Sequence, residues 1–210
     1  MIRHPAITGV VLAGGLATRM GGANKALIPS GRHNAARPIL EHLLATFTGR
    51  LAGCVLVIAP SADPEAYLGL PVTIATDRRE GCGPMGGIDA GLRAVRTSWA
   101  FVCACDMPRI SGDLIDFMAG RALDGRALVP VRGGRPEPLH ALYPAACAPV
   151  AEASLDEGIR TLRDLLARLS VDYLDERAFE HVPGASRSFD NLNTQEDLER
   201  FWREGPEASV

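Results

Sequence analysis

No apolar run in the sequence approaches the ~20 residues that a membrane-spanning helix requires. The apolar stretch near the amino terminus runs directly into a glycine-rich segment without a small-residue cleavage site, so we expect no signal peptide. The 5 cysteines are odd in number and widely scattered, which argues against a disulfide framework and favours a reducing compartment. We therefore expect a cytoplasmic protein that does not bind a membrane.

An excess of charge of one sign is also missing. The formal net charge is −3, so the chain lacks the basic field that nucleic-acid-binding proteins carry, and we expect no nucleic-acid partner. Any phosphate binding must then depend on a local group of donors and cations and not on the net charge of the chain. Cys103 and Cys105 lie two residues apart on an expected strand, but no second Cys or His pair at ligand spacing accompanies them. We expect them to be small buried apolar side chains.

At 210 residues the chain suits one domain, which we place at 1–205 with a frayed tail at 206–210. Apolar runs alternate with segments of helical periodicity, and this alternation predicts an α/β fold with a mostly parallel, covered sheet. The expected strands are 7–13, 55–59, 72–75, 100–104, 127–131, 139–143 and 172–174. The expected helices are 38–51, 86–95, 113–123, 145–153, 159–169 and 195–202.

The segment 10–25 carries the strongest functional signal, with the sequence VVLAGGLATRMGGANK. Its apolar strand ends at Gly14 and Gly15, where the backbone can turn sharply and bring N–H groups close to a ligand. Arg19 and Lys25 add two cations to the same loop. Free backbone N–H groups beside a guanidinium and an ammonium are typical of a loop that binds polyphosphate, so we predict a nucleoside triphosphate site.

Two better-known phosphate motifs do not fit this loop. A P-loop would need glycine before Lys25 and serine or threonine after it, where this chain has Asn24 and Ala26. The dinucleotide fingerprint fails because Gly14 and Gly15 are adjacent. The alternative interpretation is a glycine-rich surface loop with ordinary exposed cations.

Further polar residues follow the third and fourth expected strands. Ligands of open parallel sheets bind at the carboxyl ends of the strands, so Asp77, the segment 83–87 and Asp106 should lie beside the glycine-rich loop. A carboxylate after an apolar strand suits Mg²⁺, which one or two carboxylates and phosphate oxygens hold. We predict Asp106 as this ligand; the alternative is a turn cap. Gly86 would let the following helix approach a base or phosphate closely, or simply pack tightly.

Two later segments point to a second substrate. The loop 132–139 carries two arginines and precedes His140. Asn191 and Asn193 share one side if their segment is extended, and they offer paired amide donors and acceptors. Asparagines before a helix are often only caps, and Arg160 could meet a phosphate or be an ordinary surface arginine.

In their order along the chain, these segments resemble the molybdenum cofactor guanylyltransferases over residues 6–203. The matching motifs are Leu12–Gly15, Arg19–Gly22, Asn24–Lys25, Gly83–Ile88, Cys105–Pro108, Pro138–Tyr143 and Asn191–Thr194. The resemblance implies a three-layer α/β/α, Rossmann-like nucleotidyltransferase fold. It also implies a Mg²⁺-dependent enzyme that transfers GMP from GTP to the terminal phosphate of molybdopterin, giving molybdopterin guanine dinucleotide and pyrophosphate.

Matching positions carry the family's roles onto this chain. The resemblance implies that GTP contacts Leu12, Ala13, Gly14, Lys25, Asp77 and Asp106, that Asp106 also holds Mg²⁺, and that Asn191 and Asn193 lie on the molybdopterin side. To these we add Gly15 and Gly86 at the nucleotide and Arg160 beside molybdopterin. We expect Arg19, Lys25 and Asp106 to act on the reacting phosphates.

The chain departs from the family pattern at Ile58, where an asparagine is common, and at Asn24, which replaces an acidic residue. These departures concern base selectivity more than reaction type. A cytidylyltransferase acting on molybdopterin or a sugar-phosphate nucleotidyltransferase is the enzymatic alternative, although Gly14 and Met107 resemble the guanylyl branch. A non-catalytic nucleotide- or cofactor-binding domain is the alternative of another class. Transient contact with molybdopterin-loading or acceptor enzymes is a further expectation.

Overall fold

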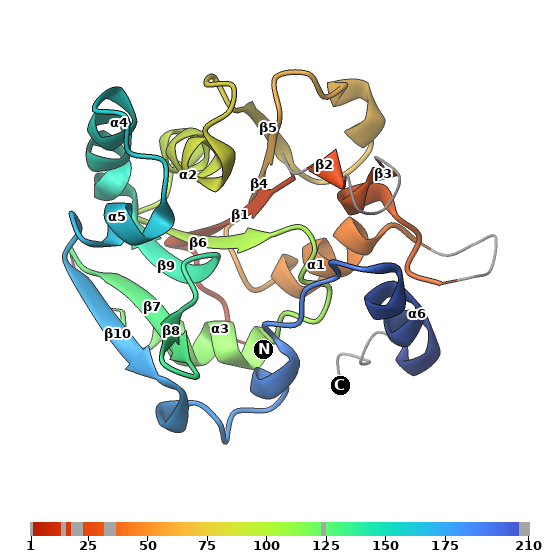
Figure 1. The fold of residues 1–210 in the computed structure, drawn as a ribbon. Coiled ribbons are helices and arrows are strands. Elements are labelled where there is room, and N and C mark those ends of the chain that lie inside the picture. The colour runs from red at the N-terminus through yellow and green to blue at the C-terminus, as the bar shows by residue number, and fades with distance from the viewer. Residues whose placement is uncertain (1, 14–15, 18–22, 32–36, 123–124, 206–210) are drawn as a thin grey trace.

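A mixed sheet of eight strands forms the centre of the protein (Figure 1). The computed structural model describes residues 2–13, 16–17, 23–31, 37–122 and 125–205. The sheet has the order β10-β7-β9-β6-β1-β4-β5, and β8 pairs with β7. Its strands are β1 (Ile7–Leu12), β4 (Cys54–Ile58), β5 (Thr73–Thr76), β6 (Trp99–Ala104), β7 (Ala127–Arg132), β8 (Arg135–Pro136), β9 (His140–Pro144) and β10 (Val171–Asp175). A separate antiparallel pair joins β2 (Leu16–Ala17) to β3 (Ala23–Asn24).

Most neighbouring strands are parallel, which confirms the expected sheet. Strands β6, β1, β4 and β5 run in one direction, and β10 is parallel to β7. Only β8 and β9 break the pattern within the described sheet, since β9 is antiparallel to both β6 and β7 and β8 is antiparallel to β7. As a result β6 and β7 point the same way, and their carboxyl ends lie at the same edge.

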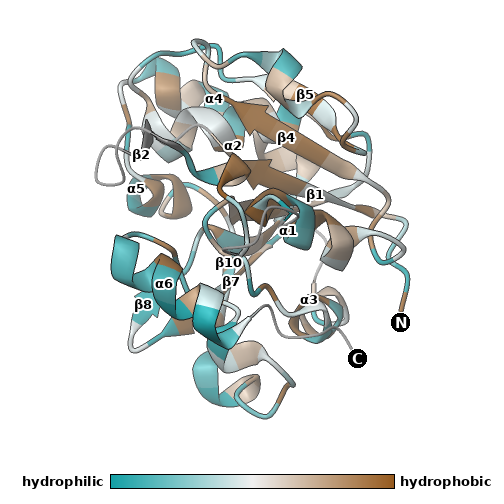
Figure 2. Cartoon of the chain, turned by 90° about the vertical axis from the view of Figure 1, so that its right-hand side faces the viewer, coloured by the Kyte–Doolittle hydropathy of each residue, from teal (hydrophilic) through white to brown (hydrophobic). Residues whose placement is uncertain are grey.

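Helices cover both faces of the sheet. The alternation of strand side chains divides the core, since Val11 packs into the cluster with α1 and α3, whereas Val10 packs into the cluster with α2, α4 and α5. Figure 2 shows the strongly apolar strands β1 and β4 inside these layers. The helices are α1 (Ile39–Phe47), α2 (Gly83–Ala94), α3 (Gly112–Ala119), α4 (Ala148–Asp156), α5 (Leu162–Leu166) and α6 (Gln195–Glu204). The chain therefore has the three-layer α/β/α arrangement.

Several element boundaries differ from the predictions for local reasons. Helix α2 begins three residues early because Pro84 is accommodated in its first turn, after Gly83 with φ of +54°. Helix α5 is shorter than 159–169, because Thr161 caps it and accepts a hydrogen bond from the backbone N–H of Asp164. The 3₁₀ turn at Pro64–Tyr67 has too short a pattern to be predicted.

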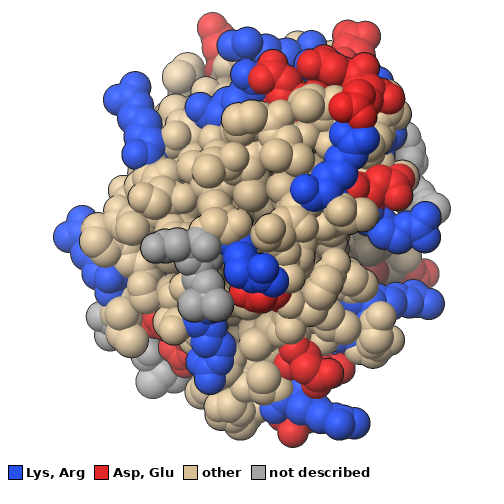
Figure 3. Space-filling model, turned by 90° about the vertical axis from the view of Figure 1, so that its left-hand side faces the viewer, with Lys and Arg blue, Asp and Glu red and all other residues tan. Residues whose placement is uncertain are grey.

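The cysteines and the charges behave as ordinary structural features. All 5 cysteines are free and buried, and Cys103 and Cys105 belong to one apolar cluster, as expected. On the face in Figure 3, basic and acidic side chains are interspersed between broad uncharged areas. No helix in the described ranges is both long enough and apolar enough to cross a membrane.

Candidate active site

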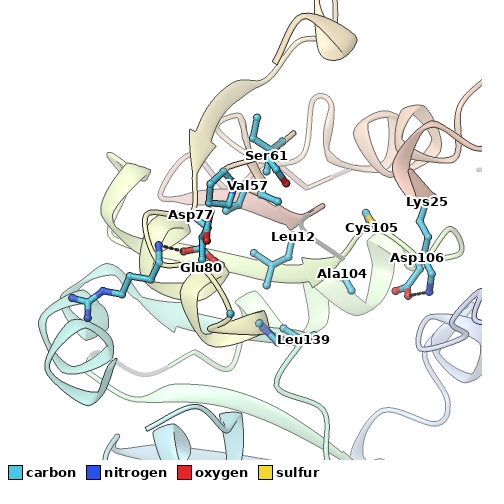
Figure 4. Close-up of a pocket in the computed structure, with 18 residues that line it drawn as sticks. Leu12, Lys25, Val57, Ser61, Asp77, Glu80, Ala104, Cys105, Asp106 and Leu139 are labelled. Carbon is cyan, nitrogen blue, oxygen red and sulfur yellow. Dashed lines mark hydrogen bonds and ion pairs between the residues drawn. The ribbon is translucent and has the colours of Figure 1, made fainter. Parts of the chain in front are cut away.

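A cavity of about 500 Å³ opens where the parallel strands end (Figure 4). Residues from the loops after β1, β4, β5 and β6 meet there, together with the start of α2 and of β9. The lining residues are Leu12, Lys25, Val57, Ile58, Ala59, Pro60, Ser61, Asp77, Arg79, Glu80, Gly81, Gly83, Pro84, Gly87, Ala104, Cys105, Asp106 and Leu139. The cavity is elongated, with Lys25 and Asp106 at one end and Asp77 at the other.

Backbone hydrogen bonds fix the strand ends that form the floor of the cavity. The carbonyl oxygen of Leu12 accepts from the N–H of Cys105 at 3.1 Å, and Ala13 donates to the carbonyl of Val57 at 2.8 Å. A Cβ on Gly87 would lie 3.2 Å from the Leu12 side chain and would push it by a few tenths of an ångström, so glycine at this position helps α2 to pack closely on the floor. The amino terminus of α2 consequently faces the cavity, and its free N–H groups favour an anion.

Lys25 and Asp106 form a close, poorly solvated ion pair. The ammonium of Lys25 lies 2.8 Å from Oδ2 of Asp106, and each side chain is only 17% exposed. Lys25 also donates to Oδ1 of Asn193 at 3.1 Å. Asn24 orients the lysine by capping the 3₁₀ turn Lys25–Leu27, because its side-chain oxygen accepts from the N–H of Ala26. Segments that are distant in the sequence thus converge on one ammonium group.

The second carboxylate oxygen of Asp106 has no hydrogen-bond partner within the described chain, although it is buried. A buried anionic oxygen without a donor is costly, and a divalent cation would satisfy it. The described residues contain no group of three or more His, Cys, Asp or Glu side chains that could hold a metal by themselves. This donor set fits Mg²⁺, which typically takes one or two carboxylates and fills its other positions with phosphate oxygens and water.

Asp77 presents a second carboxylate at the opposite end of the cavity. Its Oδ1 accepts a hydrogen bond from the N–H of Arg79 at 2.9 Å, so it also stabilises its own turn. Burial raises the pKa of Asp77, and the hydrogen bond from Arg79 opposes that shift. A Cβ built on Gly86 would lie 2.3 Å from Oδ2 of Asp77, so this carboxylate occupies its place because residue 86 lacks a side chain.

We therefore expect Gly86→Ala to raise the KM for the nucleoside triphosphate predicted from the sequence about tenfold or more, because the Asp77 carboxylate must leave its present position. Alanine is the better helix former inside α2, so the loss should not follow from a weaker helix. Steady-state kinetics at varied nucleotide concentration measures the effect. Gly120→Ala is the matched control, since its Cβ would meet only backbone oxygens at 3.7 Å. An unchanged KM in Gly86→Ala would contradict this role of residue 86.

Of the apolar wall at the end of β4, only Ile58 was singled out from the sequence, at a position linked to base selectivity. The wall consists of Val57 and Ile58 of β4 and of Ala59 and Pro60 after it, and the polar Ser61 lies next along the chain. The rule that ligands lie at the carboxyl ends of strands could have indicated this loop, but its residues carry little charge. Apolar surface suits the face of a purine or pyrimidine base.

The predicted residues on the acceptor side are not all brought together. Asn193 contacts Lys25, whereas Asn191 is half-buried and does not line the cavity. The guanidinium of Arg160 donates to the carbonyl oxygens of Leu155 and Ile159 and does not line the cavity either. The roles predicted for Asn191 and Arg160 remain predictions. Gly14, Gly15 and Arg19 lie outside the described residues.

A buried hydrogen bond anchors the segment that carries the two asparagines. Nε2 of His140 lies 2.7 Å from the hydroxyl oxygen of Ser188, and both side chains are fully buried. Burial lowers the pKa of His140 to about 4, so the imidazole is neutral near pH 7. Its ring also packs on Phe189, with centroids 4.2 Å apart. Farther along, Leu192 donates to the carbonyl of Asp106 at 2.9 Å, which joins this segment to the ion pair.

Comparison with known proteins agrees with this geometry. The family model described as the MobA-like NTP transferase domain matches residues 9–173. The molybdenum cofactor guanylyltransferase of Syntrophotalea carbinolica is 33% identical over 94% of this chain and 91% of its own length. The relative of the same name from Vibrio parahaemolyticus is 31% identical over 96% of this chain and 97% of its own.

Solved structures extend the similarity to the fold. The structure of molybdopterin-guanine dinucleotide biosynthesis protein A from Archaeoglobus fulgidus has a TM-score of 0.79 and 26% identity, covering 94% of this chain and 97% of that chain. The 2-C-methyl-D-erythritol 4-phosphate cytidylyltransferase from Thermus thermophilus has a TM-score of 0.68 at 18% identity, covering 93% and 97%, and shares the fold. This chain belongs to the molybdenum cofactor guanylyltransferase family of nucleotidyltransferases.

Proposed function

We propose that this protein transfers GMP from GTP to the terminal phosphate of molybdopterin, releasing pyrophosphate. The observation that carries the proposal is the pairing of Lys25 with Asp106, whose second oxygen is buried without a donor, at one end of the cavity. Such an arrangement suits a magnesium–triphosphate. The relatives' names supply the guanylyl group and the molybdenum cofactor.

The elongated cavity supports one orientation of GTP. The triphosphate lies at the end formed by Lys25 and Asp106, where the ammonium attracts negative charge. The guanine and ribose extend toward Asp77 and the apolar wall after β4. A carboxylate such as Asp77 can accept hydrogen bonds from a base N–H or a ribose hydroxyl.

In the reaction, an oxygen of the terminal phosphate of molybdopterin forms a bond to the α-phosphorus of GTP. The bond from that phosphorus to the bridging oxygen of the β-phosphate breaks, and pyrophosphate leaves with the bonding electrons. The attacking phosphate is already ionised, so no side chain need act as a general base. Lys25 neutralises charge that develops on the phosphates, and its release from Asp106 accompanies binding.

Asp106 would hold Mg²⁺ through its buried, unpartnered oxygen. The bound cation supplies charge neutralisation and orients the phosphate oxygens. Asn193 lies beside Lys25 and would contact the incoming phosphate of the acceptor. We further propose that residues 1–205 function as one domain, because the site draws on residues from Leu12 to Asn193.

Pyrophosphate release with GTP or CTP tests the proposal directly. With Mg²⁺ and molybdopterin present, we expect release with GTP to exceed that with CTP by at least about 10-fold. Reactions without molybdopterin measure hydrolysis and serve as the control. A preference for CTP would contradict the guanylyl assignment, and release that does not depend on molybdopterin would contradict the proposed acceptor.

A further inference from the structure

A second pocket lies at the same edge of the sheet as the active site. It has a volume of about 460 Å³ and is formed by the β7–β8 hairpin and the turn after β10. Its lining residues are Arg132, Gly133, Arg135, Glu137 and Glu176. Because β6 and β7 point the same way with β9 between them, Asp106 and this hairpin both follow carboxyl ends at one edge.

The strand order sets the separation of the two sites. Two interstrand steps, from β6 to β9 and from β9 to β7, span about 10 Å. A ligand that reaches both places must therefore extend at least about this far between its phosphate and its ring system. Leu139, the residue before β9, lines the active-site cavity between them.

Three of the pocket residues already form polar contacts with one another. The carboxylate of Glu176 accepts a hydrogen bond from the N–H of Gly133 at 3.1 Å and lies 4.0 Å from Nε of Arg132. The guanidinium of Arg132 also stacks over the ring of Phe189 at 4.8 Å from its centroid. These contacts hold the wall of the pocket in place without a ligand.

In contrast, the side chains of Glu137 and Arg135 have no such partners among the described residues. Within the described chain, the carboxylate of Glu137 has no hydrogen-bond or ion-pair partner, although the residue is half-buried. Its burial raises the pKa of the carboxyl group, and Arg132 opposes this shift. The guanidinium of Arg135 is exposed and likewise has no side-chain partner among the described residues. The pocket therefore offers one free acceptor group and one free donor group.

This pair of free groups selects the chemistry of the ligand. The two arginines and two glutamates that line the pocket balance in charge, so a multiply charged anion gains little there. A planar ring with an N–H and an amino group on one edge and a carbonyl oxygen beside them would satisfy both free groups. A carboxylate can accept both N–H groups of such an edge, and a guanidinium can donate to the carbonyl.

We propose that this pocket binds the 2-amino-4-oxopyrimidine edge of the acceptor's pterin ring, with Glu137 accepting from the amino group and ring N–H and Arg135 donating to the carbonyl oxygen. The inference rests on the proposed function, because the acceptor's phosphate must lie at Lys25 and Asp106. It assigns to the β7–β8 hairpin the selection of the second substrate.

Fluorescence titration with two matched probes tests the assignment. The probes are 6-hydroxymethylpterin, which carries an amino group at position 2 of the ring, and 6-hydroxymethyllumazine, which carries a carbonyl group at the same position. We expect the unaltered protein to bind the pterin at least about 10-fold more tightly than the lumazine, because the carbonyl oxygen at position 2 of the lumazine would repel the carboxylate of Glu137. Glu137→Gln should reduce this preference to about 2-fold or less. Glu180→Gln, an exposed site outside the pocket, should retain it.

Each other result of the titration contradicts the pocket assignment. These results are equal affinity of the unaltered protein for both probes, binding of neither, and an unchanged preference in Glu137→Gln. In the transfer reaction, Glu137→Gln should raise the KM for molybdopterin about tenfold with the KM for GTP unchanged. An unaltered protein that keeps the pterin preference but transfers no GMP would contradict the proposed function and support the pocket.

Discussion

Replacing Asp106 with asparagine should lower the rate of GMP transfer by about 10³-fold or more, because the variant loses the anionic oxygen that would hold Mg²⁺. Asparagine keeps the size of the side chain and can still accept from Lys25, so the site should remain assembled. The measurement is single-turnover transfer at increasing Mg²⁺. We expect the variant to require a higher Mg²⁺ concentration as well as to react more slowly.

A loss of folding could imitate this result, so thermal unfolding of the variant must be measured alongside. We expect a small change in Tm for Asp106→Asn. Asp106→Ala should be less stable, because it leaves the poorly solvated ammonium of Lys25 without its carboxylate. Asp113→Asn is the matched control, since Asp113 is exposed and lies on α3 outside the cavity. Activity of Asp106→Asn within tenfold of the unaltered protein would remove Asp106 from the proposed metal site.

Lys25→Ala should reduce transfer by at least about 10²-fold, since its ammonium is positioned to neutralise charge on the reacting phosphates. Lys25→Arg should recover part of the activity, because a guanidinium keeps the charge but not the compact shape of the ammonium. Transfer assays at saturating GTP separate the effect on kcat from any effect on KM. Equal activity of Lys25→Ala and the unaltered protein would exclude this role.

The sequence permits a direct chemical test of the same residue, because Lys25 is the only lysine in the chain. Pyridoxal phosphate followed by borohydride should modify Lys25, and the mass of its tryptic peptide should report the reaction. GTP with Mg²⁺ should protect it if the triphosphate lies against the ammonium. The amino terminus is the internal control, since its labelling should not depend on nucleotide. Labelling of Lys25 that GTP leaves unchanged would place the triphosphate elsewhere.

The pattern of strands was predictable because buried parallel strands are continuous apolar runs, as in β1 and β4. The same logic predicted that Lys25, Asp77 and Asp106 follow strands that end at one edge, and the structure brings them to one cavity. Their chemical roles remain predictions. The reversed direction of β9 was not predicted, because direction depends on the connection and not on the strand's own pattern.

Other features of the site depend on tertiary contacts that leave no local signal. Asn193 was assigned to the acceptor side alone, yet its side chain reaches Lys25 from the segment before α6. The loop 59–61 has few charged groups, so only its position after β4 could have indicated it. Arg160 lies near a helix start as expected, but its guanidinium turns back to the carbonyl oxygens of its own segment. Side-chain direction of this kind requires the three-dimensional structure.

The contact between Lys25 and Asn193 has a consequence for biosynthesis, since 168 residues separate its two partners. While the chain emerges from a ribosome, the glycine-rich loop and β1 are present long before the segment that completes the phosphate end of the cavity. Contacts between such distant residues form late and govern folding rates. A nascent chain that lacks the segment carrying Asn193 should therefore be unable to process nucleotide.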